Sequence, residues 1–95
     1  MSKKLNILKI GGSVLASEKH LELAAAEIYR HLRRGEKVIA VVSALQGLTD
    51  RQHKQAAAYG QESSAHIPYL LATGEMTSAS LLALTLERAG ISTCI

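Results

Sequence analysis

Two short apolar runs flank one stretch of helical spacing, and this alternation constrains the fold more than any other feature of the chain. The runs are LNILKI at residues 5–10 and VIAVV at residues 38–42. Both have the length of a strand, and the second is uninterrupted, which is typical of a strand covered on both faces of a parallel sheet. Residues 18–34 form the helical stretch, and Gly35 is placed to end it. Its apolar face is predicted to hold Leu21, Ala24, Ala25, Ile28 and Leu32.

The second half of the chain is predicted to add two helices and a third strand. Thr49 and Gln52 have the spacing of a capping box, so a short helix is expected to open there. It ends before residues 60–68, which are polar, lack a period and predict a loop. Helical spacing returns at 73–88, and ISTCI at 91–95 is predicted to be a strand. The buried stripe of the last helix is expected to contain Met76, Ala79, Ala83 and Leu86, and to be widened by Leu81, Leu82 and Leu84.

The resulting order β-α-β-α-α-β predicts an α/β fold. We expect a three-layer arrangement, with a mostly parallel sheet and helices on its faces. A sheet that ended after a third strand would leave an open edge and uncovered apolar surface. Residues 1–95 are therefore expected to form only the first, incomplete part of such a domain. The open edge would suit a second copy of the chain or a completing partner chain.

Composition favours an ordinary folded protein. Of 95 residues, 47% are hydrophobic and 20% are charged, and the net charge is +3. No long basic cluster stands beside stacking aromatics, so nucleic acid is not an expected partner. No apolar run has the length of a membrane span, and the interrupted N-terminal run does not resemble a signal peptide. The single cysteine, Cys94, excludes an internal disulfide, is predicted to be a small core residue, and fits a cytoplasmic location.

A first polar cluster follows the first strand. In open parallel α/β sheets, ligands bind beyond the carboxyl ends of the strands, and Lys9, Gly11, Gly12 and Ser13 lie at that place. The glycines permit backbone N–H groups to face an anion, and Lys9 offers a compact positive charge for phosphate oxygens. Neither GxxxxGK[ST] nor GxGxxG is present. From the residues alone, phosphate binding and a plain tight turn with Lys9 lying along the surface both stay open.

Two further clusters offer hydroxyls and a carboxylate. Ser43 follows the second strand directly, and Thr49 provides another hydroxyl unless it only caps the following helix. Glu75 is expected in the first turn of the last helix, where the helix dipole stabilises a carboxylate, or it grips an ammonium or hydroxyl of a substrate. No metal site is expected. The four histidines lack ligand spacing and are predicted to lie on the surface; they are His20, His31, His53 and His66.

Three motifs carry a resemblance to a known family. They are KIGGSVL at 9–15, VSALQGLTD at 42–50 and LLATGE at 70–75. In this order they resemble the N-terminal part of the amino-acid kinase family, and within it the aspartokinases. The lysine-glycine-glycine turn is the general family signal, whereas the second and third motifs are the aspartokinase signal. The resemblance extends from Leu5 to Ile91.

This resemblance implies a reaction and a role for each site residue. Aspartokinases transfer the γ-phosphoryl group of ATP, bound with Mg²⁺, to the side-chain carboxylate of L-aspartate. Lys9 would neutralise phosphoryl charge during transfer, and the turn after it would line the phosphate site. The amino-acid substrate would be held by Ser43, Thr49 and Glu75. The phosphate-site residues would be Lys9, Gly11, Gly12 and Ser13.

The resemblance also leaves alternatives. Aspartokinases usually read KFGGTSV at the first motif, and KIGGSVL is closer to family members that phosphorylate other acids or phosphates. The nucleotide base, the ribose and further essential residues are handled by a later half of the family's domain, so these 95 residues are expected to be inactive alone. The remaining alternative is a non-catalytic α/β module that binds a small anion or assembles with a partner chain.

Overall fold

The computed structural model describes residues 3–11, 18–45, 47–60 and 64–95. In chain order its elements are β1 (Leu5–Ile10), α1 (Glu18–Arg33), β2 (Lys37–Val42), α2 (Leu48–Tyr59) and α3 (Ile67–Arg88). The two strands are parallel neighbours, and their register runs from Leu5 opposite Lys37 to Ile10 opposite Val42. The predicted strand–helix–strand unit and the α/β class are confirmed.

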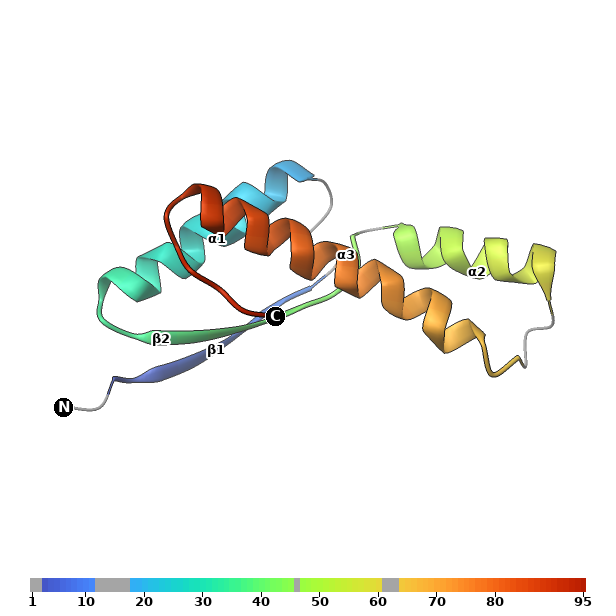
Figure 1. Ribbon diagram of the computed structural model, residues 1–95, viewed down its shortest axis with the longest axis horizontal. Helices are drawn as coiled ribbons and strands as arrows, with labels where there is room; N and C mark the ends of the chain where they lie inside the picture. Colours follow the sequence, from blue (N-terminus) through green and yellow to red (C-terminus); the bar gives the residue numbers. More distant parts are fainter. Residues whose placement is uncertain (1–2, 12–17, 46, 61–63) are drawn as a thin grey trace.

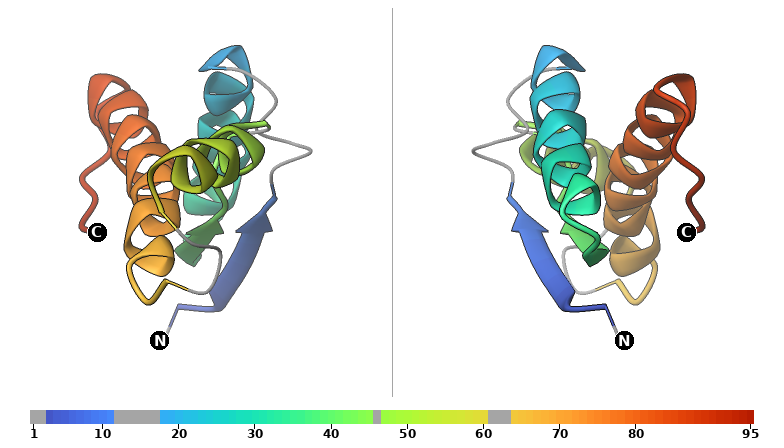
Figure 2. Two further views of the ribbon diagram at one scale, coloured as in Figure 1. Left: turned by 90° about the vertical axis from the view of Figure 1, so that its right-hand side faces the viewer. Right: turned by 90° about the vertical axis from the view of Figure 1, so that its left-hand side faces the viewer.

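Helices α1 and α3 lie side by side over one face of the sheet (Figure 2). Helix α2 packs against α3 and projects beyond the carboxyl ends of the strands, which makes the molecule elongated, 53 × 26 × 19 Å (Figure 1). The core forms where the two long helices meet the sheet. It contains Ile10, Leu21, Ala24, Ala25, Ile28, Leu82 and Leu86, so the apolar face predicted for α1 is confirmed.

The two long helices end in the same way. Gly35 after α1 and Gly90 after α3 have φ values of 79° and 84°, the left-handed conformation that glycine adopts without strain. The N–H of Ile91 bonds to the carbonyl of Leu86 at 2.9 Å, and the N–H of Gly90 bonds to that of Glu87 at 2.9 Å. This is the Schellman pattern, and it turns Ile91 back onto the core.

The other face of the sheet is open among the described residues. Side chains alternate along each strand, so those that do not face α1 and α3 lie on the opposite side. Four apolar side chains there are at least half exposed: Leu5, Ile7, Ile39 and Val41. The prediction that β2 is covered on both faces is therefore wrong for the described part of the chain, because both covering helices lie on the same face.

Helix α3 differs from its prediction in start and in buried stripe. It begins at Ile67, six residues earlier than expected, because Pro68 is tolerated in the first turn of a helix. Met76 is 58% exposed and Leu84 is 61% exposed, so the predicted stripe is wrong at these two residues. The buried positions have a spacing of four and include two small residues that permit close packing. They are Gly74, Ser78, Leu82 and Leu86.

Residues 91–95 do not form the predicted third strand. Ile91 packs on the core. Strand β2 and the segment that follows Ile91 line a groove of about 640 Å³ between them. The segment therefore makes no ladder with β2. Cys94 is exposed, so its prediction as a core residue is wrong for the same reason. Among the described helices, none is both long enough and apolar enough to cross a membrane.

A polar cluster ties the amino end of β2 to β1 and α1. The Glu36 carboxylate accepts a hydrogen bond from the Asn6 side-chain amide at 2.6 Å and lies 2.7 Å from Nδ1 of His31. The hydrogen bond with His31 is the main cause that lowers the pKa of Glu36 below its ordinary value. The His31 side chain is only 15% exposed, so its prediction as a surface residue is wrong. We call Asn6, His31 and Glu36 the amino-end clip.

Candidate functional site

The carboxyl ends of the two strands form the first part of the candidate site. Lys9 lies opposite Val41 and is exposed on the open face of the sheet, whereas Ile10 is buried toward the helices. The N–H of Ser43 bonds to the carbonyl of Ile10 at 3.1 Å, so the chains stay paired just beyond the strands. A Cβ added at Gly11 would meet nothing within 4 Å, so local packing does not require glycine there.

Two residues of the predicted phosphate site, Gly12 and Ser13, lie outside the described residues. Of the predicted phosphate site, the described residues therefore include Lys9 and Gly11. Lys9 makes no hydrogen bond or ion pair with any part of the chain that is described. Its ammonium is thus available to a ligand anion at the sheet end.

The start of α2 corrects one prediction. Gly47, with φ 82°, is the N-cap residue, and no side chain caps the helix. Thr49 is the second residue of α2, so the interpretation that it caps the helix is wrong. A left-handed glycine replaces the side-chain cap, which is why the capping-box spacing misleads here. The Thr49 hydroxyl is exposed and has no hydrogen-bond partner among the described residues.

A close contact at Gly74 joins the second and third motifs. A Cβ at this position would lie 3.1 Å from Cβ of Ala44 and 3.2 Å from Cδ2 of Leu48. Both distances are shorter than ordinary van der Waals contact, so glycine is what lets α3 approach the turn after β2 this closely. The VSALQGLTD and LLATGE motifs, far apart in sequence, are therefore neighbours in the fold.

A side-chain hydrogen bond accompanies this contact. The Nε2 amide of Gln52 donates to Oγ1 of Thr73 at 2.8 Å, and that hydroxyl donates to the carbonyl of Leu70 at 2.6 Å. Gln52 is 8% exposed. Neither the burial of Gln52 nor the role of Gly74 was foreseen from the sequence. The glycine inside a helical pattern was the only available signal, since such a residue often marks a close approach.

Glu75 lies well inside α3, not in its first turn, because the helix begins at Ile67. Its predicted stabilisation by the helix dipole is therefore wrong, since that effect is confined to the first turn. Glu75 is exposed and has no ion pair within the described ranges. Its carboxylate is available to a cation.

The carboxyl ends of the strands lie near the middle of the molecule, beside the start of α2 and the middle of α3 (Figure 1). Among the described residues, this region holds the exposed ammonium of Lys9 and two exposed carboxylates, those of Glu75 and of Asp50 in the first turn of α2. The hydroxyl of Ser43 follows β2, and that of Thr49 lies in α2. A set of this kind can bind a small molecule that carries both charges. The described residues contain no group of histidine, cysteine or acidic side chains that could hold a metal ion.

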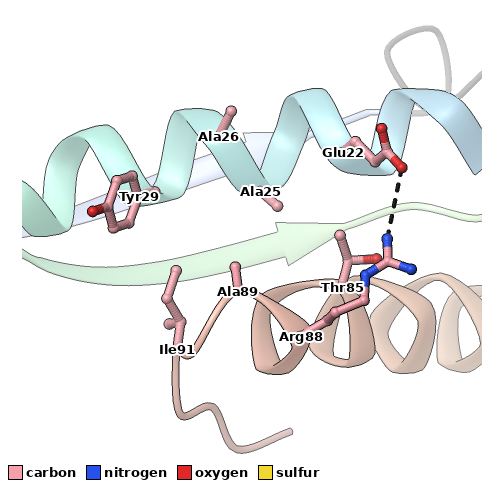
Figure 3. A pocket seen from close by; sticks show the side chains of 8 residues that line it. All are labelled: Glu22, Ala25, Ala26, Tyr29, Thr85, Arg88, Ala89 and Ile91. Atoms are coloured by element: carbon pink, nitrogen blue, oxygen red, sulfur yellow. Dashed lines mark ion pairs between the residues drawn. The ribbon is translucent and has the colours of Figure 1, made fainter.

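A second hollow, of about 300 Å³, lies between α1 and α3 and holds none of the predicted site residues. Glu22 and Arg88 reach toward each other across it, with 3.6 Å between Oε1 and Nη2 (Figure 3). The rest of its lining is largely small or apolar and includes Ala25, Ala26 and Ala89. The two charges neutralise each other, so this hollow offers a ligand less than the sheet end does.

Comparison with known proteins gives a consistent picture. A sequence model described as "Amino acid kinase family" matches residues 4–95. Aspartokinase 2 of Bacillus subtilis (strain 168) is 34% identical over 87 residues, which are 90% of this chain and 21% of the relative. Aspartokinase of Geobacillus stearothermophilus is 31% identical over 85 residues, 88% of this chain and 21% of the relative. The chain thus spans about a fifth of the length of these curated relatives.

Solved structures agree with this assignment. Aspartate kinase from Synechocystis superposes with a TM-score of 0.83 at 29% identity, covering 90% of this chain and 15% of that one. Carbamate kinase from Giardia lamblia has a TM-score of 0.69 at 20% identity, covering 93% of this chain and 32% of that one. The second similarity is one of fold alone.

Proposed function

Because the chain belongs to the amino acid kinase family, we propose that residues 1–95 are the N-terminal part of an amino-acid kinase domain and form the acceptor side of its active site. They also supply part of the phosphate site. The proposed reaction is that of an aspartokinase, and both curated relatives carry that name. A side-chain carboxylate oxygen of L-aspartate attacks the γ-phosphorus of ATP, the bond to the bridging oxygen breaks, and ADP leaves.

Lys9 is the proposed catalytic residue of this chain. Its free ammonium at the end of β1 would face the phosphoryl oxygens and offset the negative charge that builds up during transfer. The backbone at Gly11, continued by Gly12 and Ser13, would line the same phosphate group. ATP arrives with Mg²⁺, and the described part of the chain offers no cluster that would hold the metal, so its ligands would come from ATP, water and other protein residues.

The amino-acid substrate is proposed to bind between Ser43, Thr49 and Glu75. The hydroxyls would donate to a carboxylate, and the Glu75 carboxylate would accept from the ammonium. The observation that carries this proposal is the contact of Gly74 with Ala44 and Leu48, which joins the two motifs that hold these residues. Groups held on packed elements keep a substrate oriented for transfer, which is most of what such catalysis requires.

A second candidate is a non-catalytic α/β module that assembles through its open sheet. The exposed apolar side chains on the uncovered face favour it. This candidate predicts concentration-dependent association and no binding of MgATP. Sedimentation and a nucleotide titration on the same sample separate the two candidates.

The test uses the polypeptide as it occurs in its source cells. Its intact mass is compared with the 10.2 kDa of these 95 residues, and transfer from MgATP is assayed with L-aspartate and with other small acids as acceptors. Aspartyl phosphate is trapped with hydroxylamine. We expect aspartate-dependent release of ADP by the native polypeptide in the cytoplasm and none by the 95-residue chain alone. Transfer only to another acid would replace aspartate as the substrate, and no transfer to any acceptor would overturn the proposal.

A further inference from the structure

Gln52 is a buried polar residue whose presence packing does not explain. Its Nε2 donates to Oγ1 of Thr73 on α3 at 2.8 Å. Its Oε1 is buried and has no hydrogen-bond partner among the described residues. An unpaired buried acceptor costs stability, whereas an apolar residue of similar size would fill the same space without that cost. The single bond that Gln52 makes is therefore the feature to explain.

That bond joins the two elements proposed to hold the amino-acid substrate. Thr49 precedes Gln52 by three residues on α2, so the two lie on neighbouring positions of the same helix side. Thr73, the acceptor, precedes Glu75 by two residues on α3. The contact at Gly74 sets how closely α2 and α3 approach. A contact between side-chain surfaces allows one helix to roll over the other, but a directed hydrogen bond opposes that rolling.

We propose that Gln52 is a positioning residue that fixes the rotation of α2 on α3, and thereby the placement of Thr49 relative to Glu75. This inference rests on the proposed function of those two residues. Thr73 takes part because its hydroxyl accepts from Gln52 while it donates to the carbonyl of Leu70, which fixes the direction of its lone pairs. If α2 turned on α3, Thr49 and Glu75 would no longer be placed to hold the same substrate molecule together, which weakens its binding.

The decisive variant is Gln52→Leu, which removes the hydrogen bond and the unpaired acceptor together. We expect its unfolding midpoint in urea to equal or exceed that of the wild type. The KM for the amino-acid acceptor should rise about ten-fold, and kcat should change much less. Gln55→Leu makes the same change at an exposed position of α2 and should match the wild type in both measurements.

Thr73 provides an independent check on the same bond. Thr73→Val removes the hydroxyl and should raise the KM as Gln52→Leu does. Thr73→Ser keeps the hydroxyl and should have the KM of the wild type. The double variant Gln52→Leu/Thr73→Val should be no worse than either single variant, because both remove one interaction. Additive losses, or a KM that rises only in proportion to lost stability, would overturn the positioning role.

Hydrogen exchange separates this inference from the proposed function. In the native polypeptide, backbone amides in the first turns of α2 should exchange faster in Gln52→Leu than in the wild type, with global stability unchanged. If the wild type transfers phosphate to no amino acid, the proposed function fails, and exchange alone then decides whether Gln52 orders α2. Unchanged exchange in Gln52→Leu would overturn the inference whatever the substrate is.

Discussion

The two ends of the parallel sheet use polar side chains in opposite ways. At the amino end, the residues of the amino-end clip pair with one another and are mostly withdrawn from solvent. At the carboxyl end, Lys9 and Glu75 are exposed and make no bond with the described part of the chain. Polar groups that satisfy each other hold the fold, whereas groups left free by the fold are available to a ligand. Lys37 is also exposed at the amino end, so the contrast rests on the paired Glu36 carboxylate at one end and the unpaired Glu75 carboxylate at the other, and it supports the proposed site.

Replacing a lysine at each end gives the sharpest test of this difference. We expect Lys9→Ala in the native polypeptide to lower phosphoryl transfer by about 100- to 1000-fold, roughly 3–4 kcal/mol of barrier, because it removes charge stabilisation at the transition state. Lys37→Ala is the matched control, since Lys37 is exposed at the amino end of β2. It should leave transfer unchanged. Equal activities of the two variants would remove the functional distinction between the ends.

Overpacking the contact between the motifs should show how tightly the carboxyl end is built. Gly74→Val would force side-chain atoms against Ala44 and Leu48, so the free energy of unfolding should fall by about 2–3 kcal/mol, measured in urea. Ala72→Val places the same side chain at an exposed position of α3 and should cost only about 0.5 kcal/mol, the usual penalty of a β-branched residue in a helix. Similar losses in both would mean that the contact is loose.

Acid should weaken the amino-end clip selectively. The pKa of Glu36 is lower in the folded chain than its ordinary value of 4.5, chiefly because of the hydrogen bond with His31, with further help from the charges of Lys4 and Arg34. The unfolded chain therefore binds the proton more readily, so this stabilisation is complete above about pH 4.5 and is lost as the pH falls below it.

We expect thermal unfolding of Glu36→Gln to depend less on pH between 5 and about 3 than that of the wild type. Glu87→Gln, a change at an exposed position of α3, is the control and should follow the wild-type profile. If Glu36→Gln unfolds with the same pH dependence as the wild type, the clip does not stabilise the fold through this carboxylate.

The smallest effect is expected for the ion pair between α1 and α3. The side chains of Glu22 and Arg88 are 67% and 76% exposed, and 3.6 Å separates Oε1 from Nη2. Because water screens such a pair, Glu22→Gln should change the free energy of unfolding by less than about 0.5 kcal/mol. Urea denaturation at low and high salt measures this. If the free energy of unfolding falls by more than this at low salt but not at high salt, the exposed ion pair contributes as much to stability as the clip does.

Local signals predicted most of the elements but not how they meet. The face of α1 and the turn at Gly35 follow from periodicity and from the backbone freedom of glycine, and these predictions are confirmed. The capping role of Thr49 was wrong by two residues, since the N-cap is Gly47, and the first-turn position of Glu75 was wrong by more than one helical turn. Each error came from the helix start, where a glycine cap and an early proline replaced the expected signals.

The sequence by itself determined the α/β class, the strand–helix–strand order and the clusters of polar residues that follow the strands, because each depends on neighbours within a few residues. Only the tertiary structure decided that Gly74 is the contact between two motifs and that Gln52 is buried with a single hydrogen bond. Both depend on residues more than 20 positions apart, and on how closely two helices can pack. No local pattern encodes that distance, because it is set by the shapes of both surfaces at once.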